Sequence, residues 1–585
     1  MRILRAVFHH FRGFEHAAIV TSGHVVLVAE PGAGRSDVIE GLDRVLSPEA
    51  TRSRFPSEMD FFGRDTTRRA EVEVVIGDLG RDLEQAFFDV LEVWNRPRHE
   101  LVESEEDPES IDRTELDFVI RLCYRANWNS QQEQGEHWVD YPKTSDPGSG
   151  HFERVPRADR EALGFSALIS RGHVLELTQR SGFRNLVESA SGDDFSEAIR
   201  TLEVELGTRA GAFSGTSQVS AALEGVIAPL RVPLGLGTKP ASEVIRFLPE
   251  GGSIGGLLRS LSASLELPSG GGSLPVYRQG STVTTLLGVA QALATAGKGG
   301  VIAVDDFGEG LDAASGLNMA AVVRSSAAQV WISTRRAHVA EAFEPEELVR
   351  LARGKGGARE VYYGKTPKSR PERLAARHLN LQILPAVASR AVVVLEGPHD
   401  CAALKALSVR AFSELGESLP AATGVSIIDA AAADASGGSS ALGRLAAATR
   451  QLGLRTVAVL DHDGAGAEEE KVLQATLEAA DVVVRLPPGH AIELALLSGL
   501  DEGEIRAALK ELNSGLGVEL PGDLDTLVGK KLADCAKRVL KSYGGLHAQF
   551  LETLAPGRIP TVGLALLRAC VLAAADRSKS GLVQL

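Results

Sequence analysis

The feature that most constrains the fold is a series of short, apolar, β-branched segments, each followed by polar or glycine residues. The segments are Val25–Val28, Val301–Val304, Val330–Ile332, Val392–Leu395, Val425–Ile428, Thr456–Leu460 and Val482–Val484. Apolar strands that alternate with helical pattern are typical of parallel sheets covered on both faces. The sequence therefore predicts an α/β protein. Ligands bind at the carboxyl ends of strands in such sheets, so the residues after each strand are the candidates for a site.

Length and charge bound the class of protein. A chain of 585 residues predicts roughly three or four domains, and its 44% apolar and 24% charged residues are ordinary for a globular protein. The net charge of −15 excludes a generally basic nucleic-acid coat. It leaves room for a local basic groove or for a carboxylate cluster that holds metal.

The sequence predicts a cytoplasmic protein without a membrane segment. The most apolar stretch, Ile559–Ala574, has Arg568 in its middle, and no run reaches the ~18 uncharged apolar residues of a spanning helix. The first residues lack the apolar core of a signal peptide. The four cysteines lie far apart without metal spacing, which indicates buried thiols in a reducing compartment.

Three stretches interrupt the periodic pattern. Glu100–Asp117 is acidic and predicts a solvated loop or hairpin tip, and the Gly/Ser-rich Leu267–Ser273 predicts a flexible joint. Gly364–His378 carries five Lys or Arg residues against one acid, with two prolines. It predicts a hinge between an N-terminal and a C-terminal unit, either as a solvated linker or as a surface that faces phosphate.

The turn after Val25–Val28 has the chemistry of a phosphate-binding loop. Gly32 and Gly34 permit the turn, Ser36 supplies a hydroxyl for Mg²⁺, and a helix follows. The pattern G-x-x-x-x-G-K-[ST] is broken where Ala29 replaces the first Gly and Arg35 replaces the Lys. Arginine keeps the charge but is bulkier than an ammonium. A plain strand–turn–helix crossover is the alternative interpretation.

Other segments supply the context that favours the phosphate loop. An Arg-containing segment, Phe11–Phe14, precedes it, and Gly280-Ser281 opens a long helix. The strand Val301–Val304 delivers Asp305 and Asp306 to its carboxyl end. One of these acids can hold Mg²⁺ through water and the other can polarise the attacking water.

This order of motifs resembles the ABC-type ATPase heads of the RecF/SMC/OLD group (OLD, overcoming lysogenization defect). The resemblance implies ATP binding, with Asp305 serving Mg²⁺ and Asp306 standing where a catalytic Glu is usual. It implies that Gly280-Ser281 reaches the nucleotide of a second subunit and that Asp312 is the D-loop acid. Arg335 stands where the switch His is usual.

The departures from that group fall at Ala29, Arg35, Asp306 and Arg335, which are positions that drive hydrolysis. We therefore expect weak ATP binding and weak or absent ATPase activity.

A second cluster of acids follows two later strands. Glu396 ends Val392–Leu395, with Asp400 four residues on, and Asp461 and Asp463 follow Thr456–Leu460 on one side of the chain. Four converging carboxylates repel one another without cations, and oxygen ligands of this kind suit Mg²⁺ or Mn²⁺. A turn built on Asp-x-Asp is the alternative.

This second cluster resembles a Toprim domain of the OLD-family nucleases, a group that includes the nuclease subunit of the Gabija anti-phage system. Glu396-Gly397-x-x-Asp400 is similar to the family's EGxxD/E form, and Glu493 resembles a further metal-binding acid. The resemblance also implies a late basic residue, for which Arg558 and Lys530 or Lys531 are candidates.

The resemblance divides the chain into four parts. It implies an ABC-type head at 1–365 with an inserted helical dimerisation segment near 160–265, and a basic hinge at 366–384. A Toprim α/β domain at 385–500 and a helical C-terminal part at 501–585 follow. Within the insertion, Phe195, Ile199, Leu202 and Leu206 fall on one helix face, which either joins two copies or packs on its own head.

The implied function is a metal-dependent DNA endonuclease with a two-metal site, regulated by nucleotide, in anti-phage defence or DNA repair. We expect a homodimer or higher homo-oligomer and a helicase-like or other defence partner protein. The alternative is a nucleotide-gated scaffold whose head has lost hydrolysis. A topoisomerase or primase is less favoured, because the chain has neither a DNA-gate tyrosine context nor a zinc-ribbon cysteine set.

Overall fold

The structure is a computed structural model that describes most of the chain. The described residues are 1–21, 23–48, 50, 55–102, 114–169, 175, 183, 186–187, 216–248, 262–268, 272–297, 299–354, 358–431, 439–462, 467–542 and 545–585. They form two compact units, one of Met1–Val28 and Gly32–Val361 and the other of Tyr362–Leu585 with the tripeptide Ala29–Pro31.

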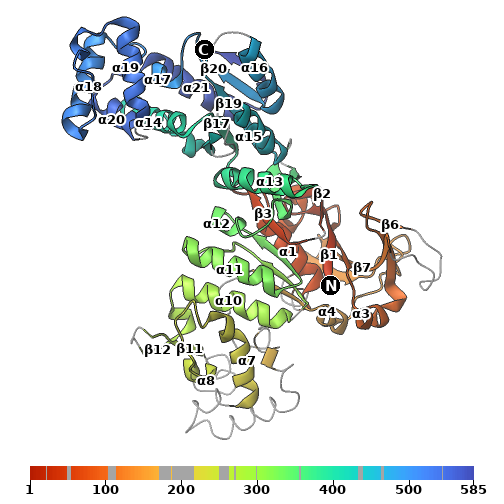
Figure 1. Cartoon of the computed structure of the whole chain (residues 1–585). Coiled ribbons are helices and arrows are strands. Elements are labelled where there is room, and N and C mark those ends of the chain that lie inside the picture. The colour runs from red at the N-terminus through yellow and green to blue at the C-terminus, as the bar shows by residue number, and fades with distance from the viewer. Residues whose placement is uncertain are drawn as a thin grey trace. The chain divides into compact units, whose positions relative to one another are not determined.

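The first unit contains a mixed sheet that carries the predicted phosphate loop (Figure 1). Its strands, in the order β16-β15-β3-β14-β13-β9, are β3 (Val25–Ala29), β9 (Phe165–Leu168), β13 (Val301–Val304), β14 (Gln329–Ser333), β15 (Leu348–Arg353) and β16 (Arg359–Tyr363). The pairs β3–β14, β14–β13 and β13–β9 are parallel, with Val26 opposite Ile332. The predicted parallel strands are thus confirmed. Because β9 belongs to this sheet, residues 165–168 are not part of an insertion.

A long antiparallel sheet forms the other layer of this unit, and the sequence analysis did not predict it. Its order is β2-β1-β4-β7-β5-β6, with β8 on β7. The strands are β1 (Arg2–Phe11), β2 (Phe14–Val20), β4 (Ala70–Gly77), β5 (Leu91–Asn95), β6 (Glu100–Val102), β7 (Leu116–Asn129) and β8 (Gln134–Asp140). Residues 103–113 of the predicted acidic loop lie outside the described residues.

Helix α1 (Arg35–Leu46) lies between these two sheets. It contacts β4 and β7 on one side and β9, β13 and β14 on the other. Gly41 permits this approach, because a Cβ there would lie 2.6 Å from Cε1 of Phe8. With both sides covered, every residue from Val38 to Leu46 is buried. The phosphate loop is therefore attached to a helix that is packed between two sheets.

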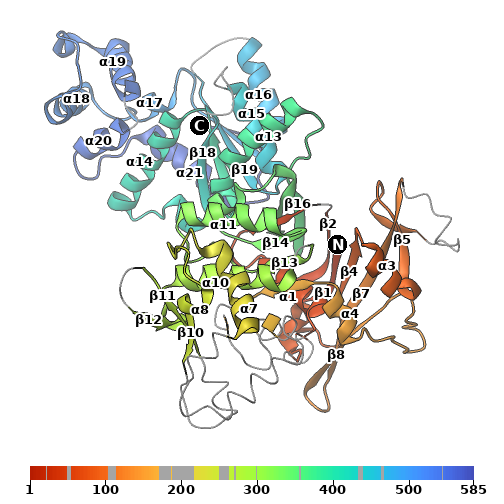
Figure 2. The same cartoon turned by 60° about the horizontal axis from the view of Figure 1, so that its bottom comes forward.

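The first unit contains further helices among its described residues, most of them labelled in Figure 2. They are α3 (Arg81–Ala86), α4 (Arg157–Ala162), α7 (Ser217–Ile227), α8 (Ala241–Val244), α10 (Ser281–Ala296), α11 (Ala313–Ser326) and α12 (Ala337–Ala340). Near the predicted insertion, an antiparallel sheet of β10 (Ile245–Leu248), β11 (Ser262–Glu266) and β12 (Ser273–Pro275) accompanies α7 and α8, so the segment is not wholly helical. The face of Phe195, Ile199, Leu202 and Leu206 lies outside the described residues.

The second unit is built on five parallel strands in the order β18-β17-β19-β20-β21. They are β17 (Ala391–Leu395), β18 (Val425–Asp429), β19 (Arg455–Leu460), β20 (Val482–Arg485) and β21 (Gly581–Gln584). The first four confirm predicted strands. The last corrects the expectation of a purely helical C-terminal part, because the chain returns to the sheet beside β20.

Helices cover both faces of this sheet. They are α13 (Arg370–Ile383), α14 (Pro398–Leu415), α15 (Ser439–Gln451), α16 (Ala467–Ala479), α17 (Ile492–Ala495), α18 (Glu502–Leu516), α19 (Gly529–Ser542), α20 (Leu546–Thr553) and α21 (Thr561–Ala575). Most of the predicted hinge is thus the regular helix α13, whose N-cap Ser369 accepts a hydrogen bond from the Glu372 amide.

The order of the strands reverses between β17 and β19. From β17 the chain passes through α14 to β18 on one side, then returns through α15 to β19 on the other side of β17. In sheets of this kind the reversal predicts a ligand crevice outside the carboxyl ends of the two strands. The residues after Leu395 and Leu460 stand at the place of this expected β17–β19 crevice.

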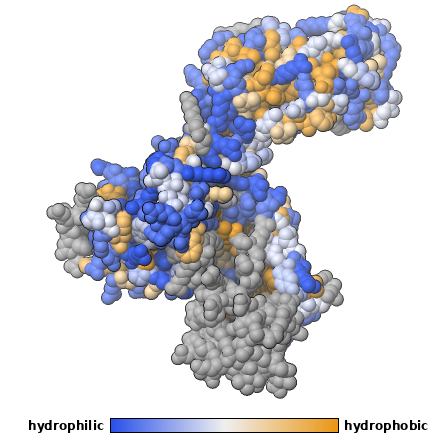
Figure 3. All heavy atoms as spheres, turned by 180° about the vertical axis from the view of Figure 1, so that it is seen from behind, coloured by the Kyte–Doolittle hydropathy of each residue, from blue (hydrophilic) through white to orange (hydrophobic). Residues whose placement is uncertain are grey.

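One face of α14 exposes large hydrophobic side chains. Val409, Phe412 and Leu415 are 59%, 54% and 47% exposed and are spaced three residues apart. Figure 3 shows hydrophobic side chains gathered on the second unit, as seen from behind. Contiguous exposed apolar surface of this kind marks contact sites.

Candidate functional site

The phosphate loop has the predicted backbone geometry. It leaves β3 at Ala29 and enters α1 at Arg35. Gly32 and Gly34 have φ values of 73° and 96°, and Gly34 is the N-cap of α1. This left-handed region favours glycine, which explains why both positions lack a side chain. The helix start turns unpaired N–H groups toward the loop, where they can bind an anion.

Ser36 and Asp305 lie in contact at this end of the sheet. Oγ of Ser36 donates a hydrogen bond to Oδ1 of Asp305 at 3.0 Å, and Oγ of Ser333 donates to the same oxygen. β14 lies between β3 and β13 in the sheet, so it brings Ser333 between the two partners. A hydroxyl and a carboxylate in contact are a suitable pair of oxygen ligands for Mg²⁺.

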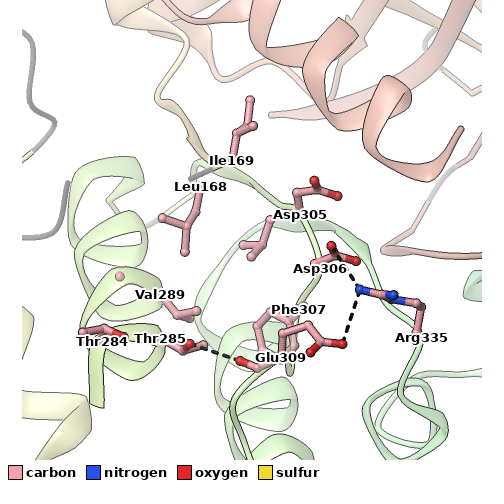
Figure 4. Close-up of a pocket in the computed structure, with 12 residues that line it drawn as sticks. Leu168, Ile169, Thr284, Thr285, Val289, Asp305, Asp306, Phe307, Glu309 and Arg335 are labelled. Carbon is pink, nitrogen blue, oxygen red and sulfur yellow. Dashed lines mark hydrogen bonds and ion pairs between the residues drawn. The ribbon is translucent and has the colours of Figure 1, made fainter. Parts of the chain in front are cut away.

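Asp306 stands between two cations at the edge of a hollow. Its backbone is left-handed, with φ 46°, and its N–H donates to Oγ of Ser333 at 2.8 Å. Its carboxylate lies 3.9 Å from Nη2 of Arg35 and 3.5 Å from Nη2 of Arg335. Figure 4 shows Arg335 directed at Asp306 and Glu309.

Arg35 is directed toward β14. Nη1 donates to the carbonyl oxygen of Thr334 at 2.5 Å, and the side chain is 10% exposed. Burial lowers the pKa of Arg35, and the charge of Asp306 opposes that effect. The guanidinium therefore ties the start of α1 to the end of β14, which differs from the expected place of the phosphate-loop lysine.

A cavity of about 320 Å³ lies beside these residues. Its lining includes the polar side chains of Thr284, Thr285, Asp305, Asp306, Glu309 and Arg335. Oγ1 of Thr285 donates to the backbone oxygen of Glu309 at 3.1 Å, which joins α10 to the turn after β13. The predicted acids thus border a real hollow within the first unit.

The signature-like residues lie at the start of α10. Gly280 is the N-cap of this helix, and a Cβ at the left-handed Gly310 would lie 2.8 Å from Cβ of Ser281. Asp312 caps α11. Its carboxylate accepts two hydrogen bonds from Ser315, one from the N–H at 3.0 Å and one from Oγ at 2.6 Å. A helix cap alone accounts for an Asp at this position.

In the second unit, acids gather at the crevice between β17 and β19. Glu396 and Asp461 directly follow these strands, and Asp400 lies in the first turn of α14, where it accepts from the N–H of Gly397 at 2.9 Å. Asp429 ends the neighbouring β18, opposite Leu395. Asp463 lies outside the described residues.

Glu493 brings a buried charge into this region. Its side chain is 0% exposed, and Nζ of Lys541 lies 3.2 Å from Oε1. Among the described residues, neither carboxylate oxygen accepts a hydrogen bond of good geometry. Burial and the charge of Glu493 raise the pKa of Asp400 to about 6, and Asp429 adds to the rise. The region therefore has too much negative charge for one ammonium to balance.

Lys541 is a site residue that the sequence analysis missed. Burial alone would lower its pKa, but the carboxylates of Glu493, Asp400 and Asp461 raise the pKa above its usual value. Its signal in the sequence is the basic stripe of the amphipathic α19, where Lys530, Lys537 and Lys541 recur at helical spacing.

Arg558, the basic residue that the sequence suggested, contacts Glu504 and Gly499. Its Nε and Nη2 donate to the two carboxylate oxygens of Glu504, each at 2.7 Å, and Nη2 also donates to the carbonyl of Gly499. Within the described ranges, no three His, Cys, Asp or Glu side chains stand close enough together to hold a metal ion. The structure thus brings Asp400, Glu493, Asp461 and Lys541 into one region without a closed metal cage.

Comparisons with known proteins give matches among solved structures alone. No family model matches the sequence, and no curated protein matches it. The chain is similar to an Smc head bound to the C-winged helix domain of ScpA, with 14% identity over 62% of this chain and 97% of that chain, at a TM-score of 0.36. It is also similar to the Smc head domain with an extended coiled coil bound to the C-terminal domain of ScpA derived from Pyrococcus furiosus (14% identity, 61% and 95% covered, TM-score 0.33).

None of the helices in the described part of the chain is both long enough and apolar enough to cross a membrane.

Proposed function

We propose that this chain is a metal-dependent DNA endonuclease of OLD type whose first unit binds nucleotide. The observation that carries the nuclease proposal is the position of Lys541, whose ammonium lies among Glu493, Asp400 and Asp461 beside the β17–β19 crevice. Acids gathered with a lysine near strand ends supply the chemistry that phosphodiester hydrolysis needs, because charge must be balanced at both metal and phosphate.

We propose that oxygen atoms of this region hold a divalent cation, although no three of the described acids stand close enough together to form a cage by themselves. Both oxygens of the buried Glu493 lack hydrogen bonds of good geometry from the described residues, and the raised pKa of Asp400 marks a site where another negative charge is costly. Oxygen ligands suit Mg²⁺ or Mn²⁺. Glu396, Asp400, Asp461 and Glu493 would hold the metal, with Asp463 helping. A bound metal would supply Lewis acidity and a water of lowered pKa.

We assign the basic role to Lys541 rather than to Arg558. The guanidinium of Arg558 is committed to both oxygens of Glu504, whereas Lys541 is 46% exposed and meets the acids of the crevice. An ammonium at this position can neutralise a phosphate group that enters from solvent. DNA is the proposed substrate, and the net charge of −15 requires it to approach a local basic surface.

A plasmid-cleavage assay with Mg²⁺ or Mn²⁺, with and without ATP, tests the proposal. We expect cleavage with metal, none in EDTA, and a change in rate with ATP. A metal-loaded protein that leaves DNA intact under every nucleotide condition would remove the nuclease proposal.

The head is proposed to bind ATP with Mg²⁺, and the contact of Ser36 with Asp305 is the observation that favours this. Weak hydrolysis is part of the proposal, because Arg35 and Asp306 depart from the residues that drive it. The same proposal includes a two-fold pairing of heads through Gly280-Ser281. It also includes a partner protein with which the chain acts in anti-phage defence or repair.

A nucleotide-gated scaffold is the second candidate. The contacts of Arg35 with Thr334 and of Asp306 with Arg335 favour it, because they tie the catalytic positions to the protein. The two candidates differ in one result: a scaffold binds ATP and assembles but does not cleave DNA.

A further inference from the structure

Two arginines from neighbouring strands reach the phosphate loop. Arg353 is the last residue of β15, which neighbours β3, and Arg359 is the first residue of β16, which lies beyond β15 at the edge of the sheet. Nη2 of Arg359 donates to the carbonyl oxygen of Gly32 at 2.9 Å. No local sequence pattern marks either residue, because both lie more than three hundred positions from the loop.

The guanidinium of Arg353 lies close against the loop backbone. A Cβ at Gly32 would lie within contact distance of Nη2 of Arg353, and the φ of 73° is what favours glycine at this position. A Cβ at Gly13, in the segment before β2, would lie 3.1 Å from Nε of Arg359. The guanidinium of Arg359 therefore spans from Gly13 to Gly32.

Further arginines lie near the loop. Arg12 donates to Asp60 at 2.8 Å and lies 3.4 Å from Asp37 and 3.6 Å from Glu40. Arg35 donates to Thr334 and faces Asp306. A triphosphate carries several negative charges, so positive charge gathered at this end of the helix favours its binding.

The charge of Arg359 also acts on Asp37 at the start of α1. Burial raises the pKa of Asp37, and the charges of Arg12 and Arg359 oppose that rise. This places Arg359 at the end of the helix where N–H groups point outward and where anions bind.

We propose that Arg353 and Arg359 replace the missing lysine as the cations that hold the phosphates of a nucleotide in this loop. This rests on the proposed nucleotide binding of the head and names the residues responsible for it. The guanidinium fork suits phosphate, because it donates two parallel hydrogen bonds where an ammonium presents a point charge. In a chain of net charge −15, such a local pair is needed to attract a polyanion.

Isothermal titration calorimetry with ATP and with inorganic tripolyphosphate tests the proposal on the full chain. The variants are Arg353→Gln with Arg359→Gln, Arg353→Lys with Arg359→Lys, and Arg35→Gln. The matched control is Arg96→Gln with Arg98→Gln, which removes two exposed arginines of the same unit. A melting curve of each variant verifies that it folds.

We expect the Gln pair at 353 and 359 to lower the affinity for both ligands at least about tenfold, since each charge-assisted hydrogen bond contributes about that much to binding. The Lys pair should recover most of that loss, which a purely structural role of the Gly32 contact would not allow. Arg35→Gln should lower the affinity for both ligands less than the Gln pair does, because its guanidinium already donates to Thr334. The control at 96 and 98 should change affinity less than about threefold.

Two results overturn the proposal in distinguishable ways. If the wild-type chain binds both ligands and the Gln pair at 353 and 359 binds them equally well, the arginine assignment fails while nucleotide binding stands. If the wild-type chain binds neither ATP nor tripolyphosphate, the nucleotide-binding head itself fails, and the arginine assignment fails with it.

Discussion

Oγ of Ser36 donates a 3.0 Å hydrogen bond to Oδ1 of Asp305, a residue 269 positions further along the chain. The contact places the two oxygen groups of the proposed magnesium site side by side. The neighbouring acid, Asp306, is instead held between Arg35 and Arg335. The proposed head would therefore combine a magnesium pair with altered residues for hydrolysis.

We predict that the head turns ATP over far more slowly than about 1 s⁻¹. Arg35 is held by Thr334, and Asp306 is shorter than the usual Glu and is engaged by Arg335. Each departure removes a few kcal/mol of transition-state stabilisation, so a deficit of several orders of magnitude is expected. Phosphate release measured with saturating Mg²⁺ and ATP verifies the rate.

A restoring variant sharpens this measurement. Arg35→Lys combined with Asp306→Glu should raise the rate at least about tenfold, because it returns a compact charge and a longer carboxylate. A wild-type rate near 1 s⁻¹ or above would show that the altered residues do not limit hydrolysis.

Replacement of Lys541 by Met should abolish DNA cleavage while the chain stays folded. The substitution keeps most of the apolar stem but removes the ammonium 3.2 Å from Glu493. Arg558→Met is the matched comparison, because its charge is bound to Glu504. We expect Arg558→Met to retain cleavage and to change only the melting temperature. The opposite pattern would return the basic role to Arg558.

Glu396→Ala and Asp461→Ala should each eliminate cleavage in Mg²⁺ and in Mn²⁺. Each change removes a proposed metal ligand at a strand end without opening the core, so folding should be unaffected. Glu470→Ala, an exposed acid on α16 of the same unit, serves as the control and should cleave normally. Cleavage and melting temperature are measured on the same samples. Normal cleavage by either strand-end variant would refute the crevice as the active site.

The chain should be at least a dimer without nucleotide. The proposed ABC-type head would need Gly280-Ser281 from a second copy to enclose the phosphates, and a two-fold pairing is the simplest closed assembly. The exposed Val409, Phe412 and Leu415 of α14 offer a further apolar contact. Light scattering at micromolar concentration decides the matter, since a single chain has a mass of 61.9 kDa. A mass of one chain would contradict the prediction.

The sequence predicted the elements whose signal is local. β13 and the Asp305-Asp306 pair follow from a β-branched run and the acids after it, and the strand appears with the predicted bounds. In contrast, Arg353 and Arg359 carry no motif, because their role depends on β15 and β16 lying next to β3. Sheet order of this kind is a tertiary property that periodicity does not report.

The same reason explains why the sequence did not indicate β21 or the position of Lys541 in the second unit. The four residues of β21 are too few to stand out after a long helix, and only their pairing with β20 makes them a strand. Lys541 resembled any other cation on the polar side of an amphipathic helix. It is recognised as a candidate site residue only in the fold, where α19 places it next to Glu493.

Asp400→Asn should stabilise the metal-free protein at pH 7.5 and lose that advantage in acid. The folded-state pKa of Asp400 is raised from 3.8 to about 6, first by burial and then by Glu493. Ionisation is therefore penalised in the folded state: the cost is absent below about pH 4 and complete above about pH 6 to 7. One pKa unit corresponds to about 1.4 kcal/mol, so the penalty removed is roughly 1–3 kcal/mol.

An amide oxygen can still accept the hydrogen bond that Gly397 donates, so Asn removes the charge without removing the helix contact. Melting curves in EDTA from pH 4.5 to 7.5 should show the difference growing with pH. Asp525→Asn, at a carboxylate that is 72% exposed, should show no such trend. Added Mg²⁺ should reverse the order, because only the wild-type site gains stability from a bound cation. A metal-free Asp400→Asn protein that melts below the wild type at pH 7.5 would show that the crevice tolerates its charges without a cation.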